Sequence, residues 1–211
     1  MTMQKAPLIG ICRHRLSVDG EGVTTLVAFH GCTLHCRYCL NAQCLQPDGV
    51  WREVTTGELL DEVRIDNLYF VATGGGITFG GGEPCLRSLF IKEFAEMMPE
   101  EWNIAIETSL NVERHHVERL ADIASQWIID IKDTNADTYR AYTGHDNRRA
   151  LENLRWLLGK PGMAEKITVR LPLIPEYNNA ADVETSRRQL ETMGAKLFDE
   201  FEYVVQVQRN P

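Results

Sequence analysis

Six short runs of aliphatic and β-branched residues recur along the chain, and longer stretches with apolar residues at helical spacing separate them. The strand-like runs cover residues 24–30, 77–79, 103–107, 127–131, 167–173 and 201–207. They are mostly apolar throughout rather than alternating between apolar and polar residues. Because strands buried on both faces have this composition, the runs predict one parallel sheet covered by helices.

The intervening stretches predict helices over residues 57–67, 86–98, 112–125, 148–159 and 181–193. Thr55 followed by Glu58 predicts a capping box at the first helix, Asn111 is expected to cap the third, and Gly194 is expected to end the last. The alternation predicts right-handed crossovers within a single α/β domain spanning residues 1–211. Six units are fewer than the eight of a closed barrel, which favours a partial (βα)6 parallel barrel. An open doubly wound sheet would give the same linear pattern.

Polar residues and glycines gather where the predicted strands end. In chain order these are a group of cysteines after the first strand, a glycine-rich segment with Glu83 after the second, Glu107 at the third, Asp130 and Lys132 at the fourth, and Arg170 within the fifth. Because the carboxyl ends of parallel strands meet at one edge of the sheet, the sequence predicts a functional site there.

Composition and charge narrow the class of protein. At 44% hydrophobic and 25% charged residues, the 211-residue chain has the composition of a globular protein. Its net charge of −8, without a basic stretch, argues against a nucleic-acid partner. No apolar run approaches the ~20 residues of a membrane span, and the start lacks signal-peptide features, so we expect a cytoplasmic protein with no membrane association. Thiols stay reduced there, so the six cysteines are expected to be metal ligands, reactive thiols or core residues.

Three of the cysteines form a C-x3-C-x2-C motif, with Cys32, Cys36 and Cys39 on one short segment. Thiolates are the usual ligands of iron–sulfur clusters, and four-iron clusters commonly take four of them. Three ligands would leave one iron open to a substrate or cofactor. A zinc ion is the main alternative, with His35 and Cys44 completing its ligand set, although this spacing is unusual for zinc.

The motif, with Tyr38 before its last cysteine, resembles the signature of the radical S-adenosylmethionine (SAM) superfamily. Residues 17–22 (SVDGEG), 74–83 (GGGITFGGGE) and 130–132 (DIK), together with Arg170, resemble the activating enzymes of glycyl radical enzymes, of the pyruvate formate-lyase activating enzyme type. The resemblance implies a barrel of the radical SAM type, one [4Fe-4S] cluster, SAM, and flavodoxin or ferredoxin as the reductant. It further implies that SAM is cleaved to a 5′-deoxyadenosyl radical, which abstracts a hydrogen atom from a glycine of a partner enzyme.

The same resemblance assigns residues to SAM. Those implied for SAM binding are Tyr38, Cys39, Leu40, Gly81, Gly82, Glu83, Asp130, Ile131, Lys132 and Arg170. In this interpretation the Gly-Gly pair lets the backbone approach the methionine part of SAM, and Glu83 either binds its ammonium group or orients the loop. Lys132 and Arg170 would face the SAM carboxylate, and salt bridges at the strand ends are the alternative.

Two more sites follow from the resemblance. The resembling activators hold a monovalent cation, for which the matching residues are Glu107, Thr108, Ile128 and Asp130. Those enzymes have an aspartate where this chain has Glu107, and the longer side chain weakens the prediction. Asp19 matches an aspartate that contacts the substrate peptide, and the alternative for it is a simple turn residue.

The chain also departs from the family. A histidine usually follows the sixth strand, and none is present in this sequence, where Gln206, Gln208 or Arg209 are the candidates to replace it. The remaining cysteines lack partners at metal-ligand spacing and are expected to be buried packing residues: Cys12, Cys44 and Cys85.

Two other functions stay open at this point. One is a small-molecule radical SAM enzyme similar to 7-carboxy-7-deazaguanine synthase, whose family also has a Gly-Glu-Gly turn before its first strand. The other is a non-enzymatic module that binds zinc or a cluster, which predicts no cleavage of SAM. The paired motifs at residues 17–22 and 74–83 favour the activating enzyme.

Overall fold

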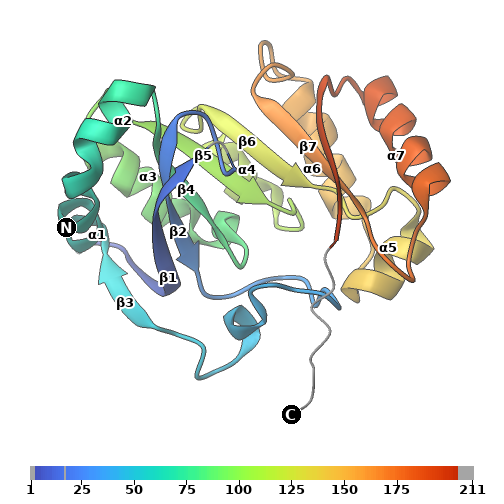
Figure 1. The fold of residues 1–211 in the computed structure, drawn as a ribbon, viewed down its shortest axis with the longest axis horizontal. Coiled ribbons are helices and arrows are strands. Elements are labelled where there is room, and N and C mark those ends of the chain that lie inside the picture. The colour runs from blue at the N-terminus through green and yellow to red at the C-terminus, as the bar shows by residue number, and fades with distance from the viewer. Residues whose placement is uncertain (1–2, 17, 204–211) are drawn as a thin grey trace.

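One curved sheet carries the fold (Figure 1). The computed structural model describes residues 3–16 and 18–203, in which eight strands follow the order β3-β1-β2-β4-β5-β6-β7-β8. Their bounds are β1 Lys5–Leu16, β2 Val23–Phe29, β3 Arg52–Thr55, β4 Gly76–Gly81, β5 Asn103–Thr108, β6 Gln126–Asp130, β7 Ile167–Leu173 and β8 Leu197–Glu202. From β2 to β8 neighbouring strands are parallel, whereas β1 runs antiparallel to β2 and β3. Within the described residues the barrel stays open, because β3 and β8 stand at opposite ends of the order.

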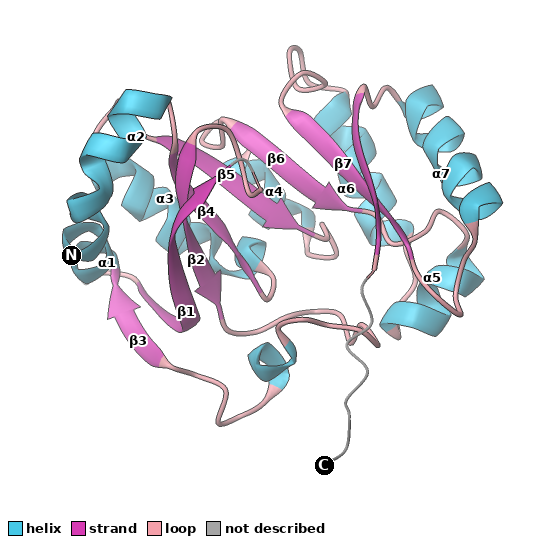
Figure 2. Cartoon of the chain, viewed as in Figure 1, coloured by secondary structure: helices cyan, strands magenta, loops and turns pink. Residues whose placement is uncertain are grey.

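Helices surround the outer side of this sheet (Figure 2). They are α1 Thr56–Val63, α2 Asn67–Thr73, α3 Ser88–Met97, α4 Arg114–Leu120, α5 Ala136–Thr143, α6 Arg148–Leu158 and α7 Ala180–Met193, with 3-10 turns at Ala42–Leu45, Arg64–Asp66 and Pro84–Arg87. The capping box of Thr55 and Glu58 is confirmed, and Gly194 ends α7 with a φ of 108°. The predicted cap at Asn111 is wrong, because α4 begins later, after Glu113. None of the described helices is long and apolar enough to cross a membrane.

Several elements differ from the sequence prediction. The strands β1 and β3 and the helix α5 were not predicted, and the first predicted helix is divided into α1, a 3-10 turn and α2. The sixth barrel strand lies at Leu197–Glu202 rather than 201–207, and residues 204–207 lie outside the described residues. This edge strand is mostly exposed and is held by its backbone pairing with β7, so an apolar run does not mark it.

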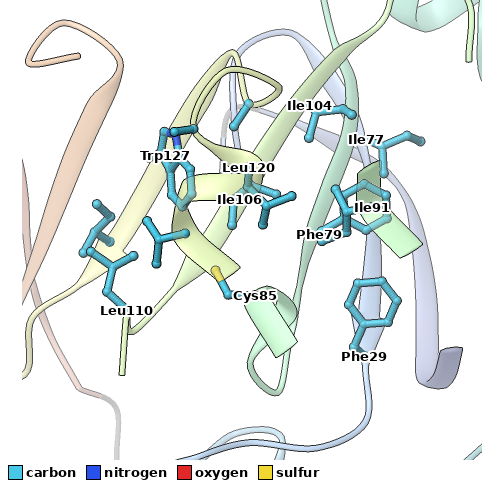
Figure 3. Close-up of a cluster of buried hydrophobic side chains, with 14 of the residues drawn as sticks. Phe29, Ile77, Phe79, Cys85, Ile91, Ile104, Ile106, Leu110, Leu120 and Trp127 are labelled. Atoms are coloured by element: carbon cyan, nitrogen blue, oxygen red, sulfur yellow. The ribbon is translucent and has the colours of Figure 1, made fainter. Parts of the chain in front are cut away.

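The apolar core lies between the sheet and the helices, and the inner side of the sheet is more polar. Figure 3 shows Ile77 and Phe79 of β4 in the core with Ile91 of α3, and the rings of Phe29 and Phe79 stack 5.5 Å apart. Between Ile77 and Phe79, Thr78 instead donates its hydroxyl hydrogen to the carbonyl of Asp19. This alternation along a strand places apolar side chains outside and polar groups inside, where a site can form.

Candidate functional site

The three cysteines of the motif line one cavity at the carboxyl ends of the central strands. The cavity measures about 160 Å³ and is lined by Leu26, Cys32, Leu34, Cys36, Cys39, Leu40, Asn41, Gly81, Gly82, Glu107, Thr108, Ser109, Asp130, Lys132 and Tyr203. Most of these residues belong to the loop after β2 or to the ends of β4, β5 and β6. The fold therefore brings together residues that the sequence placed at different strand ends.

The loop that carries the cysteines, residues 30–45, is fixed by backbone hydrogen bonds to two other elements. The carbonyl of Gly31 accepts from the N–H of Glu83 in the glycine-rich loop (2.8 Å). The N–H groups of His35 and Arg37 donate to the last carbonyl groups of α5 at 2.9 and 3.1 Å. Gly31 itself has a φ of 100°, a conformation that glycine adopts without strain. These backbone hydrogen bonds therefore tie the loop to the glycine-rich loop and to α5.

The three thiols differ in their electrostatic surroundings. Burial raises the pKa of Cys36 to about 12. A hydrogen bond from the thiol of Cys44 outweighs burial at Cys39 and lowers its pKa to about 6. The same thiol also lowers the pKa of Cys32, while its own pKa is raised by the two contacts. Cys44 is buried as predicted, but it contacts two of the motif cysteines rather than serving only as packing.

Three cysteine thiols that line one cavity are the donor set that an iron–sulfur cluster uses. The described residues contain no group of three His, Cys, Asp or Glu side chains that could hold a single metal ion. In a four-iron cluster each thiolate binds a different iron, so three thiols in the lining of one cavity suit that group. The other two cysteines are separate from the cavity: Cys85 is buried as expected, whereas Cys12 is exposed, so its predicted burial is wrong.

The glycine-rich loop packs against the cysteine loop so closely that side chains do not fit. A Cβ atom on Gly81 would lie 2.7 Å from the Cα of Ala28, and one on Gly82 would lie 2.2 Å from the carbonyl oxygen of Gly31. Gly81 also has a φ of 92°. Both glycines line the cavity, but the immediate reason for their absent side chains is this backbone contact.

Glu83 joins the glycine-rich loop to the end of β5. One carboxylate oxygen accepts from the Cys85 N–H (3.1 Å) and the Thr108 hydroxyl (2.6 Å). The other accepts from the Ser109 N–H (3.0 Å) and the Ser109 hydroxyl (2.7 Å). Glu83 is 1% exposed and is not among the residues that line the cavity. Of the two roles expected for it, the structure therefore favours orienting the loop.

A buried lysine stands on the cavity wall. The ammonium group of Lys132 donates to Oδ2 of Asp130 (2.9 Å) and to the hydroxyl of Tyr203 (3.0 Å). Burial alone would lower the pKa of Lys132, but Asp130 and Tyr203 hold it well above its ordinary value. The cavity therefore contains a fixed positive charge beside the cysteines.

A second charged group lies on the inner side of the sheet. Arg170 donates to Oε1 of Glu107 (2.5 Å), to the carbonyl of Val18 (2.7 Å) and to Oδ2 of Asp199 (3.3 Å). Burial raises the pKa of Glu107 to about 6, with Asp130 adding to the rise and Arg170 opposing it. Arg170 does not line the cysteine cavity, and protein groups occupy its guanidinium, so its contact with SAM stays a prediction.

Three other residues assigned to SAM lie in different surroundings. Leu40 lines the cavity while 73% exposed, which places it at the mouth. The hydroxyl of Tyr38 donates to Glu176 (3.0 Å), and the ring is not among those lining the cavity. Ile131 is fully buried in the core. Because the side chain of Ile131 is buried in the core, only its backbone could contact SAM.

The residues predicted for a monovalent cation converge only in part. Glu107, Thr108 and Asp130 line the cysteine cavity, whereas Ile128 lines a neighbouring cavity of about 490 Å³. The hydroxyl of Thr108 is engaged by Glu83. Oδ1 of Asp130 is buried and has no hydrogen-bond partner within the described part of the chain, which makes it the oxygen available to a cation.

Asp19 lies inside the fold, on the loop between β1 and β2. It is 3% exposed, and its carboxylate accepts from Arg15 at 2.5 and 3.2 Å. Its carbonyl accepts the hydroxyl of Thr78 from the inner side of β4. A contact with a substrate peptide therefore stays a prediction, and in this structure the carboxylate is occupied by Arg15.

Sequence reasoning missed Tyr203. It follows β8 directly, the place where the family resemblance expects a histidine, and it lines the cavity. The proposed replacements Gln206, Gln208 and Arg209 lie outside the described residues. The apolar run VVQV placed the predicted strand at residues 201–207, a range that includes Tyr203. A tyrosine in a strand does not by itself indicate a functional residue.

Comparison with known proteins agrees with this geometry. Residues 26–188 match the family described as the Radical SAM superfamily. The chain is 31% identical over 173 residues to the pyruvate formate-lyase-activating enzyme of Staphylococcus aureus (strain USA300), a match covering 79% of this chain and 68% of that enzyme. A solved domain of pyruvate-formate lyase-activating enzyme from Bacteroides vulgatus is similar with a TM-score of 0.54 at 22% identity, covering 65% of this chain and 86% of that domain. SuiB of Streptococcus suis, solved with S-adenosylmethionine, has a TM-score of 0.65 at 13% identity over 87% of this chain and 43% of that one. At these identities, the two solved structures show that the chain shares their fold.

Proposed function

Because the chain belongs to the radical SAM superfamily, we propose that it installs a glycyl radical on a partner enzyme by hydrogen abstraction. The observation that carries the proposal is the single cavity in which three cysteine thiols, a Gly-Gly backbone and a buried lysine meet. The choice of a glycyl radical enzyme as the substrate is supported by the 31% identity to an enzyme named for activating pyruvate formate-lyase.

In the proposed reaction Cys32, Cys36 and Cys39 would hold the [4Fe-4S] cluster through their thiolates. When bound, the cluster and SAM would supply the chemistry, in which an electron cleaves SAM to methionine and a 5′-deoxyadenosyl radical. Deprotonation of the thiols is part of assembly, and it is easiest at Cys39, whose pKa is lowered to about 6.

The other residues of the cavity would bind and orient SAM. The ammonium group of Lys132 suits its carboxylate, since hydrogen bonds between charged partners are the strongest available. Gly81 and Gly82 line the cavity and would present their backbone to the methionine part. Oδ1 of Asp130 and the carboxylate of Glu107 would hold a monovalent cation if one binds. The leucine side chains in the lining would help to restrict water once SAM is bound.

The partner would enter from the inner side of the open sheet. The neighbouring cavity is lined by Val18, Gly20, Glu21, Gly22, Gln126, Ile128, Thr168, Arg170 and Asp199. Arg170, which lines this cavity, forms an ion pair with Glu107, which lines the cysteine cavity. A glycine-bearing loop of a glycyl radical enzyme would reach the site by this route, and flavodoxin or ferredoxin is the class of reductant that the family resemblance implies.

The test compares two cysteine variants of the protein reconstituted with iron and sulfide without oxygen. Cys36→Ala should lose most of the bound iron and the formation of 5′-deoxyadenosine from SAM after reduction. Cys12→Ala is the matched control, because Cys12 is exposed and lies outside the motif, and it should retain both. Equal iron content in the two variants would refute the cluster assignment.

The partner is tested separately by electron paramagnetic resonance. Mixing the reduced, SAM-loaded protein with candidate glycyl radical enzymes should give the signal of a glycyl radical in one of them. Cleavage of SAM with no such signal, but with turnover of a small-molecule substrate, would instead support the small-molecule radical SAM alternative.

A further inference from the structure

We propose that Tyr203 is a positioning residue for Lys132, and that the two side chains together receive the carboxylate group of the ligand in the cysteine-lined cavity. The identity of that ligand as SAM rests on the proposed function. The pairing of the two residues rests on the structure alone, and Tyr203 belongs to none of the sequence motifs that mark the family.

The backbone holds Tyr203 in place directly after β8. Its N–H donates to the carbonyl of Leu173 on β7 (2.9 Å), which continues the pairing of the two strands. Its ring contacts those of Phe201 and Tyr142, with centroids 5.6 and 6.1 Å away. Tyr142 belongs to the end of α5, to which the cysteine loop is also bonded. The hydroxyl of Tyr203 is therefore fixed relative to both the sheet and the loop.

Counting donors shows what the pair offers to a ligand. An ammonium group has three hydrogens, and those of Lys132 go to Asp130 at 2.9 Å and to Tyr203 at 3.0 Å, which leaves one without a partner among residues 3–16 and 18–203. Because the Tyr203 oxygen accepts from Lys132, its own O–H hydrogen is also available as far as the described part of the chain is concerned. Both residues line the cavity, and Lys132 is only 6% exposed. One N–H and one O–H next to each other match the two oxygens of a carboxylate.

The ring of Tyr203 also limits where Lys132 can lie. A lysine side chain is flexible, and both members of a hydrogen bond must be held for the bond to select one geometry. Asp130 fixes the ammonium group from one side and the Tyr203 hydroxyl from another, with Nζ 5.4 Å from the ring centroid. Without that hydroxyl, Lys132 would keep its charge but lose one of its two fixed contacts.

Binding to the cluster-loaded protein tests the role of the hydroxyl. Two probes are compared by calorimetry: S-adenosylhomocysteine, which has the carboxylate, and 5′-methylthioadenosine, which lacks it. Tyr203→Phe should weaken the first about tenfold, since a hydrogen bond to a charged group contributes on this scale, and should leave the second unchanged. Tyr177→Phe is the control, because Tyr177 packs on Tyr142 without lining the cavity. An equal loss for both probes would overturn the proposal.

A double-mutant cycle in the cluster-free protein tests the pairing without any ligand. Tyr203→Phe, Lys132→Met and the double variant are unfolded with urea, and the shifts of the three midpoints are compared. Non-additive shifts are expected because the residues share a hydrogen bond, whereas additive shifts would overturn the pairing. If the wild-type protein bound neither probe, the proposed use of SAM would fail, while non-additive shifts would still support the pairing.

Discussion

Glu83 offers the most direct test of how the site is built, since its carboxylate accepts four hydrogen bonds while nearly all of it is buried. The perturbation is Glu83→Gln, which keeps the shape of the side chain and one carbonyl oxygen. The amide nitrogen that replaces the second oxygen cannot accept from the Ser109 N–H. The variant therefore leaves at least one buried backbone donor without a partner and weakens the contacts of its neighbours.

The magnitude follows from that count. A buried donor without a partner costs about 1–3 kcal/mol, and hydrogen bonds to a charged acceptor contribute about 1.5–3 kcal/mol each. The Ser109 hydroxyl can rotate to accept a hydrogen bond from the new amide, so its bond is not counted as lost. We expect Glu83→Gln to lower the free energy of unfolding by roughly 2–4 kcal/mol, a large share of the ~5–15 kcal/mol typical of a domain.

Urea unfolding of the cluster-free protein, followed by far-ultraviolet circular dichroism, measures this difference. Glu118→Gln is the matched control because Glu118 is exposed on α4, and its effect should stay within about 0.5 kcal/mol. If Glu83→Gln were no more destabilising than Glu118→Gln, Glu83 would not hold the two loops together. A role limited to the ammonium group of SAM would then be the better explanation.

Two further predictions concern the glycine loop and the inner carboxylates. Gly82→Ala should destabilise the protein by more than about 2 kcal/mol, because its Cβ would lie 2.2 Å from the carbonyl oxygen of Gly31. Gly10→Ala is the control, since nothing lies within 4 Å of a Cβ at that position. Equal urea midpoints for the two variants would contradict the contact of Gly82 with Gly31. The pKa of Glu107 is raised from 4.5 to about 6, so the folded chain keeps this proton longer than the unfolded chain and loses stability as pH rises through that window. Glu107→Gln should flatten this part of the pH profile of urea unfolding by up to about 2 kcal/mol, and parallel profiles for the two proteins would refute the shift.

The parallel strands were predictable because burial on both faces selects continuous apolar runs. The unpredicted elements lack that signal for physical reasons. β1 buries Ala6 and Leu8 on alternate positions and exposes much of its second half, so only a short period-two pattern marks it. α5 has an N-cap at Asn135 and a left-handed Gly144 at its end, signals that were present in the sequence but that bound a helix of only eight residues.

The candidate site also has a part that could be predicted from the sequence and a part that could not. The meeting of Cys32, Cys36 and Cys39 at one cavity was predictable because they lie at short spacing on one loop. The contacts of Lys132 with Tyr203 could not be predicted, because they join residues 71 positions apart and depend on the register of an edge strand. Site residues that are close in sequence can be predicted from their spacing, whereas contacts between residues on different strands can be found only from the three-dimensional structure.

The structure separates two kinds of residue at the site. Gly82 and Glu83 make their contacts with the protein itself, to the cysteine loop and the end of β5. Changes there should therefore lower stability and cluster retention together. Lys132 and Tyr203 line the cavity, and their hydrogen bonds to other described residues leave donors unused. Changes there should act mainly on ligand affinity. A motif residue is thus best assigned to SAM only when binding falls while the stability of the cluster-free protein is maintained.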